Sequence, residues 1–226
     1  MTIIDSHRVF IGACGWLHEA WQEQFYPQDL PGEWQLAYYG NEFPLVMVRQ
    51  QEWRNGGEVA EWLDETDETP LFICELPLQL LEGDLLAAAE PYLDNIRQLA
   101  GRCLGIVCHA PTHVDTEAFA AVINKCKQLA PTCVEIEGTG NEALQQLLAS
   151  LAVNQVWKQP EHTEQVNGPL VVARINCQAV NLKELRRVME SLLHYDDKQH
   201  TLVLLLDGEP PDLEMIKQAK MMLELM

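Results

Sequence analysis

Short apolar runs alternate with longer amphipathic segments along most of the chain. Eight runs are apolar at both odd and even positions, as expected for strands that are covered on both faces. Between them, apolar residues recur at helical spacing. The predicted strands are Val9–Cys14, Leu45–Arg49, Leu71–Leu76, Leu104–His109, Cys133–Ile136, Val153–Trp157, Leu170–Ile175 and Leu202–Leu206. The predicted helices are Glu33–Tyr39, Gly57–Asp64, Gly83–Ala100, Thr116–Leu129, Asn141–Leu151, Leu182–Tyr195 and Leu213–Leu225.

This alternation predicts an α/β fold with a parallel sheet and helices outside it. Eight strands in 226 residues fit a (β/α)8 barrel of the TIM type. No helical periodicity runs from Lys158 to Pro169, so we expect a loop in place of the sixth helix. Pro91 predicts a kink or a break in the third helix. An open doubly wound sheet is the alternative, but its Gly-x-Gly-x-x-Gly fingerprint is absent. Without a linker or an internal repeat, residues 1–226 are predicted to form one domain.

Composition narrows the class of protein further. No apolar run approaches the ~20 residues of a membrane span, and the first eight residues lack a signal-peptide pattern. We therefore expect a cytoplasmic protein without a membrane segment. Seven cysteines without a Cys-x-x-Cys pair indicate core thiols rather than a disulfide framework or a zinc site. A formal charge of −19 repels phosphate backbones, which disfavours nucleic acid as a partner.

The first predicted strand ends in glycines and is followed by aromatic residues. This segment resembles the opening motif of the YecE-like proteins, the family called domain of unknown function 72. The resemblance lies in the spacing of Gly12, Gly15, Trp16, Trp21 and the tripeptide Phe25-Tyr26-Pro27. Weaker matches follow in Phe72-x-x-Glu75-x-Pro77, His109-x-Pro111, Val134-Glu135-Ile136-Glu137 and Ala173-Arg174-Ile175-Asn176. The resemblance implies a (β/α)8 barrel whose biochemical activity is not established.

In such a barrel, polar residues at the C-terminal ends of the strands form the ligand site. We expect the five residues Glu75, His109, Glu135, Arg174 and Asp207 to converge at this rim. The predicted ligand-binding residues are Trp16, His18, Arg49, Glu75, Arg174, Asn176 and Asp207. The candidate catalytic residues are Glu135, Glu137 and His109. Glu135 and Glu137 share one face of a strand. Two such carboxylates can divide acid and base roles or, with His109 and Asp207, hold a divalent metal.

Simpler interpretations stay open for three of these residues. Glu137 precedes Gly138 and is also consistent with a solvated loop position. Arg174 interrupts an apolar strand, and a buried guanidinium needs either a carboxylate such as Glu135 or an anionic ligand. Trp16 either stacks on a flat ligand or fills the top of the barrel, and filling the barrel is favoured.

The chain departs from the motifs of the family it resembles. Met47 and Arg49 stand where YecE-like proteins have a carboxylate and an amide, Glu75 where they have lysine, and Glu137 where they have arginine. These differences would turn an anion-friendly mouth into one that repels anions. We therefore predict a divergent, non-catalytic YecE-like protein that binds a small molecule or a protein partner at the strand ends, without a cofactor. The alternative is a metal-assisted hydrolase or isomerase that uses Glu135, Glu137, His109 and Asp207.

Overall fold

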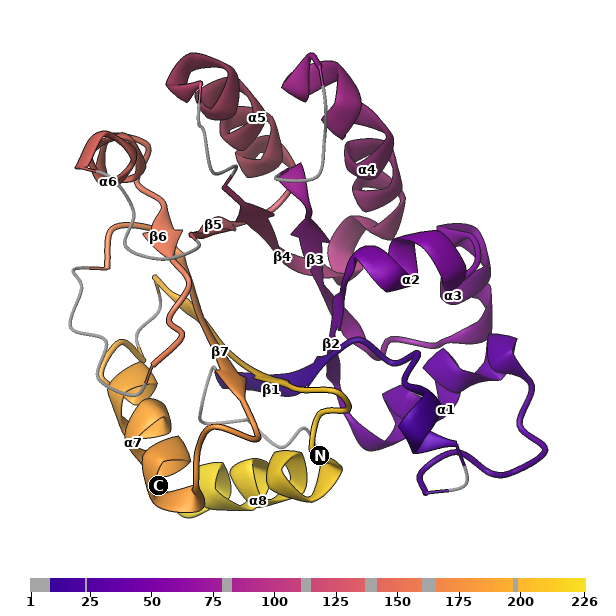
Figure 1. The fold of residues 1–226 in the computed structure, drawn as a ribbon. Helices are drawn as coiled ribbons and strands as arrows, with labels where there is room; N and C mark the ends of the chain where they lie inside the picture. The colour runs from indigo at the N-terminus through magenta and orange to yellow at the C-terminus, as the bar shows by residue number, and fades with distance from the viewer. Residues whose placement is uncertain are drawn as a thin grey trace.

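Eight parallel strands form one sheet in the computed structural model, which describes residues 9–22, 24–78, 83–110, 115–136, 142–159, 166–196 and 199–226. The strands are β1 Val9–Cys14, β2 Leu45–Val48, β3 Leu71–Leu76, β4 Cys103–His109, β5 Thr132–Glu135, β6 Asn154–Gln155, β7 Leu170–Asn176 and β8 Thr201–Asp207. Their order in the sheet is β6-β5-β4-β3-β2-β1-β8-β7, which Figure 1 shows as a ring around the centre of the molecule.

The two edge strands, β6 and β7, meet through Trp157. The backbone N–H of Trp157 donates to the carbonyl oxygen of Val172 at 2.8 Å, and its carbonyl oxygen accepts the N–H of Arg174 at 2.8 Å. This bridge closes the sheet, so the predicted (β/α)8 barrel is confirmed and the open sheet is excluded. In the predicted loop before β7, Lys158, Gln159 and residues 166–169 are not helical, and residues 160–165 lie outside the described part of the chain.

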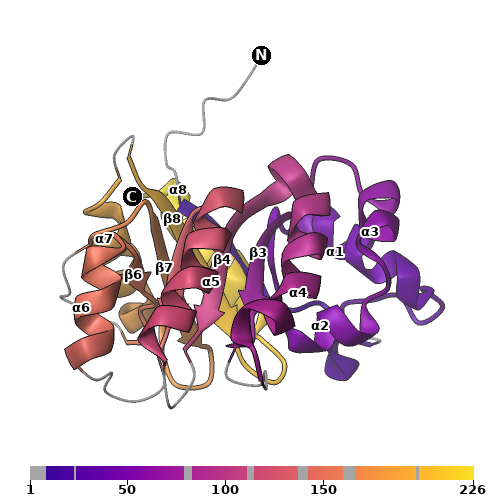
Figure 2. The same cartoon turned by 90° about the horizontal axis from the view of Figure 1, so that it is seen from above.

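Helices cover the outside of the barrel, and α4, α5 and α6 lie side by side along one flank (Figures 1 and 2). Within the described ranges, the helices are α1 Gln35–Glu42, α2 Gln50–Asn55, α3 Val59–Glu65, α4 Leu85–Leu99, α5 Thr116–Leu129, α6 Glu142–Ser150, α7 Leu182–Leu193 and α8 Leu213–Glu224. All but α2 were predicted, with bounds that differ by a few residues. In the described part of the chain, no helix has the length and hydropathy needed to cross a membrane.

Helix α4 is continuous through Pro91, so the alternative of two separate helices was wrong. A proline inside a helix cannot donate a hydrogen bond to the carbonyl four residues earlier, here that of Ala87. Both Pro91 and Ala87 are exposed, so water can take the place of the missing donor. The helix begins at Asp84, whose carboxylate accepts the N–H groups of Leu86 and Ala87 as an N-cap.

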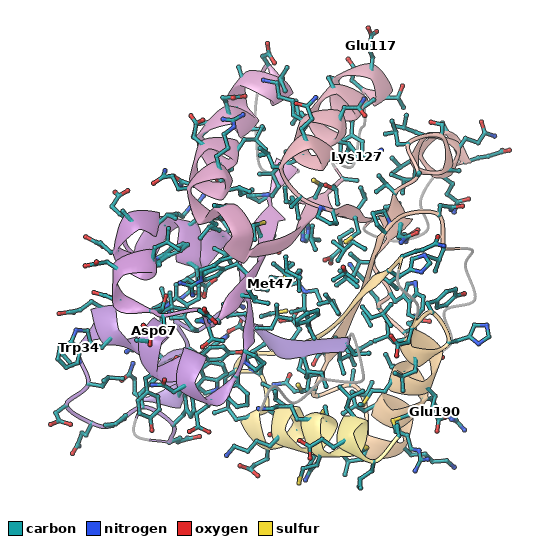
Figure 3. The ribbon with its side chains drawn as sticks, turned by 180° about the vertical axis from the view of Figure 1, so that it is seen from behind. Trp34, Met47, Asp67, Glu117, Lys127 and Glu190 are labelled. Carbon is teal, nitrogen blue, oxygen red and sulfur yellow. The ribbon has the colours of Figure 1, made fainter. Side chains whose placement is uncertain are left out.

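Alternate residues of the strands fill the barrel interior. Met47 lies at the centre of the fold (Figure 3), with its sulfur 3.7 Å from that of Cys14. Gly12 lets β1 approach β2, because an added Cβ would lie 2.0 Å from the carbonyl oxygen of Leu45. The interior is therefore a packed core and not a channel. The buried residues that form it are Cys14, Leu45, Met47, Ile73, Val107, Cys133, Val156, Leu170, Val172, Val203 and Leu205.

Candidate functional site

Polar side chains stand directly above this packed interior, at the C-terminal ends of the strands. Each lies two residues beyond an interior side chain, as Arg174 does beyond Val172, and residues two apart on a strand share a face. The apolar layer below holds them at one level and separates them from the core. We call this set the mouth ring, and its members are Arg49, Glu75, His109, Glu135, Lys158, Arg174 and Asp207.

Arg174 on β7 is the centre of the mouth ring. Its Nη1 donates to Oε1 of Glu75 at 3.1 Å and to Oε2 of Glu135 at 3.0 Å. Its Nε donates to Oδ2 of Asp207 at 2.8 Å. The side chain is only 14% exposed, and a guanidinium with so little water around it needs such partners. One cation thus joins carboxylates from β3, β5 and β8.

His109 and Lys158 complete the hydrogen bonds of the two glutamates. Nε2 of His109 lies 2.9 Å from Oε1 of Glu75 and 3.3 Å from Oε2 of Glu135. Nζ of Lys158 lies 2.7 Å from Oε1 of Glu135. The backbone N–H of Gln50 donates to Oε2 of Glu75 at 3.0 Å. Each of the four oxygens of these carboxylates therefore has at least one donor.

These donors determine the charge of the two glutamates. Burial raises the pKa of Glu75, but His109, Arg174 and the N–H of Gln50 outweigh it and lower that pKa to about 2. Burial also raises the pKa of Glu135, and Arg174, His109 and Lys158 again outweigh it and hold the pKa below its usual value. Both glutamates are consequently ionised at neutral pH, which is the wrong state for a general acid.

A second group of charged residues surrounds Arg49, at the end of β2. Nη1 of Arg49 donates to Oε1 of Glu209 at 3.0 Å, and its Nε donates to Oε2 of Glu52 at 3.4 Å. Glu52 has no exposed surface and also accepts the backbone N–H of Arg49 at 3.0 Å, an arrangement that starts helix α2. Glu209 is 77% exposed and reaches over from the segment after β8.

His18 lies beside this second group. Its Nε2 donates to the carbonyl oxygen of Cys14 at 2.9 Å, and its Nδ1 lies 3.6 Å from Oε2 of Glu209. Burial, followed by the charge of Arg49, lowers the pKa of His18 below 6.5. The imidazole is therefore mainly neutral at pH 7.

Two of the predicted ligand-binding residues contact groups outside the mouth ring. Trp16 is 2% exposed, packs edge-on against Trp62 at 5.2 Å, and accepts the hydroxyl of Tyr26 at its carbonyl oxygen at 2.8 Å. Asn176 is exposed and accepts the N–H of Gln178 in the turn after β7.

The structure thus brings the five expected rim residues together, with Arg49 in the same ring and His18 next to it. The candidate Glu137 lies outside the described residues. Three charged residues of the site were not among the predicted ligand-binding or catalytic residues: Glu52, Lys158 and Glu209. A signal exists for Glu52, because a carboxylate three residues after Arg49 fits the spacing of a capping box.

The mouth ring is occupied by its own cations. Among the described residues, no group of three or more His, Cys, Asp and Glu side chains is arranged to hold a metal ion. Both Arg174 and His109 contact the facing oxygens of Glu75 and Glu135. A divalent cation bound between these carboxylates would have to displace Arg174, because like charges repel.

Comparison with protein families gives a match to the family described as "Protein of unknown function DUF72", over residues 10–226. No curated protein matches the chain, and no solved structure matches it. The matched region contains every residue of the mouth ring and of the group around Arg49.

Proposed function

We propose, from the premise that the chain belongs to the DUF72 family, that the mouth ring binds a small cationic or neutral ligand without catalysing a reaction on it. The family match confirms the resemblance of the opening motif to the YecE-like proteins. The proposal treats the chain as one cytoplasmic domain that needs no cofactor. Its main support is the state of Glu75 and Glu135, whose carboxylate oxygens are all engaged.

The engaged carboxylates argue against acid–base catalysis. A general acid or base works best when its pKa lies near the working pH. The pKa of Glu75 is about 2, and that of Glu135 is also below its usual value, so both are weak bases. Arg174 is equally committed, with three carboxylate partners. A site whose charges satisfy one another is better suited to holding a ligand than to transferring protons.

The balance of charge at the mouth favours a cationic or neutral ligand. Among the described residues of the mouth ring and of the group around Arg49, carboxylates outnumber the lysine and arginine side chains by two, with the histidines left out of the count. The carboxylates are Glu52, Glu75, Glu135, Asp207 and Glu209, and the cations are Arg49, Lys158 and Arg174. The formal charge of −19 on the whole chain adds to the repulsion of an anion. Asp207, 27% exposed, and Glu209, 77% exposed, are the carboxylates most accessible to an ammonium group.

Ligand-dependent shifts in melting temperature test this proposal. The probes are a series of primary amines (ethanolamine, putrescine and spermidine), alcohols of matched size, and inorganic phosphate, all at one ionic strength. We expect the amines or the alcohols to stabilise the protein and phosphate to have no effect. Asp207→Asn should weaken the effect of the amines, whereas the control Glu117→Gln on α5 should not. Stabilisation by phosphate alone would contradict the proposal.

A further inference from the structure

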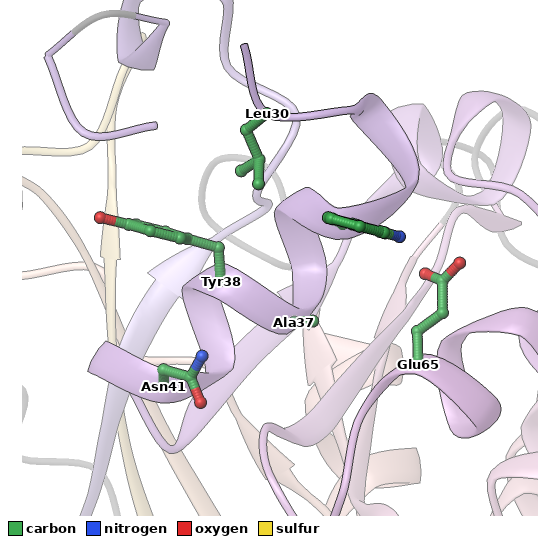
Figure 4. A pocket seen from close by; sticks show the side chains of 6 residues that line it. Leu30, Ala37, Tyr38, Asn41 and Glu65 are labelled. Atoms are coloured by element: carbon green, nitrogen blue, oxygen red, sulfur yellow. The ribbon is translucent and has the colours of Figure 1, made fainter. Parts of the chain in front are cut away.

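A groove of about 320 Å³ lies on the outside of the barrel, between α1, the loop before it and the end of α3. None of its lining residues belongs to the mouth ring. Its volume is at the lower end of the range for ligand sites, so it suits one or two side chains and not a large cofactor. The groove is lined by Leu30, Trp34, Ala37, Tyr38, Asn41 and Glu65 (Figure 4).

Trp34 is the most unusual residue of this groove. It is 57% exposed and lies at the periphery of the molecule (Figure 3), whereas the other five tryptophans are buried or half-buried. An indole in water leaves a large apolar surface that a partner can cover. Exposed aromatic residues beside a depression are typical anchors of protein–protein contacts.

Carboxylates gather around Glu65, one of the residues that line the groove. Burial and the charges of Glu33, Glu61 and Asp64 raise the pKa of Glu65, so its surroundings carry a negative potential. On other helices, acidic side chains have partners, such as Glu190 with Arg186 and Glu214 with Lys217. Glu33, Asp64 and Glu65 form no ion pair within the described ranges.

We propose that the groove around Trp34 docks a lysine or arginine side chain from a basic segment of a partner protein. The aliphatic stem of such a side chain would pack on Leu30, Ala37 and the indole ring, and its charge would lie beside Glu65. A cation over an indole also gains a favourable electrostatic interaction. The formal charge of −19 on the chain would draw a basic segment toward this surface.

Fluorescence anisotropy with labelled peptides tests the proposal on the full chain. The probe is a hexapeptide that contains arginine and lysine separated by leucine. Its neutral counterpart has citrulline and acetyl-lysine at the same positions. We expect saturable binding of the basic peptide only. Trp34→Ala should weaken binding about fivefold, the contribution of an exposed indole to a cation contact. Glu65→Gln should weaken binding and reduce its dependence on salt.

Matched variants separate the groove from the general surface. Leu225→Ala removes another apolar side chain, 87% exposed, and Glu117→Gln removes an acidic charge from α5; both should bind like the wild type. Trp34→Phe keeps an aromatic ring and should lose less affinity than Trp34→Ala. Unchanged binding by Trp34→Ala or equal affinity for the neutral peptide would overturn the proposal. Self-association of the wild type that sedimentation detects and that Trp34→Ala abolishes would also overturn it.

Discussion

Replacing Arg174 with methionine removes the one cation that joins three carboxylates of the mouth ring. Methionine retains much of the apolar stem, so the packing above Val172 is largely kept. The change leaves Glu75 and Glu135, which are 8% and 6% exposed in their side chains, with one of their two shared partners, His109. It therefore tests whether the ion pairs of the ring contribute to the stability of the barrel.

The expected loss follows from the pKa of Glu75. Its fall from 4.5 to about 2 corresponds to about 3 kcal/mol of stability at neutral pH. His109 contributes more than Arg174 to this lowering, so the arginine accounts for only part of it. Its loss also removes the partner of Glu135 and Asp207, and breaking a buried ion pair on one side costs roughly 3–5 kcal/mol. We expect Arg174→Met to lower the free energy of unfolding by about 3 kcal/mol at pH 7.

The loss should depend on pH in a defined direction. In the wild type, the folded-state pKa of Glu75 is lowered, so its contribution is fully present above pH 4.5 and is lost as the pH falls toward 2. Without Arg174, Glu75 and Glu135 take up protons at a higher pH and relieve their own repulsion. The difference between wild type and variant should therefore shrink as the pH falls below 4.5.

Urea unfolding, followed by tryptophan fluorescence and circular dichroism at pH 7 and pH 3.5, measures both effects. The control is Arg186→Met, which removes an exposed pair with Glu190 on α7 and should cost less than about 1 kcal/mol. A loss below about 1 kcal/mol for Arg174→Met at pH 7 would refute the reasoning, as would an equal loss at both pH values.

Three further outcomes follow from the packing and the charges. Gly12→Ala should yield little soluble protein, because its Cβ would lie 2.0 Å from the carbonyl oxygen of Leu45; a folded variant of unchanged melting temperature contradicts this. His18 should titrate below pH 6.5 by NMR, and because unfolding restores its usual pKa, its protonation should reduce stability as the pH falls below 6.5. Iodoacetamide should alkylate Cys103 first, because a hydrogen bond with Cys74 lowers the pKa of Cys103 and the other six cysteines are buried. Mass spectrometry identifies the order of alkylation, and modification of Cys74 before Cys103 contradicts this.

The strands could be predicted from sequence because both of their faces are covered. In β7, for example, Leu170 to Ile175 are apolar apart from Arg174, and a run of this kind fits few other structures. Helix α2 could not be predicted in the same way. It has only six residues, and Glu52, the one that it buries, is held by ion pairing and not by hydrophobic contact.

The candidate site was partly predictable for a related reason. The polar residue that ends each apolar run is visible in the sequence, and this placed Glu75, His109 and Arg174 at one rim. The partner of Arg49 was not visible. Glu209 lies 160 residues further along the chain, and the two meet only because β8 pairs with β1, the strand next to β2. No local pattern encodes a contact of that range.

The closure of the barrel through Trp157 has a mechanical consequence. Strand β6 has only two residues, so we expect the seam, where β6 meets β7, to separate more easily than the other pairs of neighbouring strands. Lys158 follows Trp157 directly, and the N–H of Arg174 is one of the groups that bridge the seam. Separation of the two strands there would move Lys158 away from Arg174, and these two cations would no longer both contact Glu135. A ligand that contacts both sides of the mouth would consequently stabilise the closed form of the whole barrel.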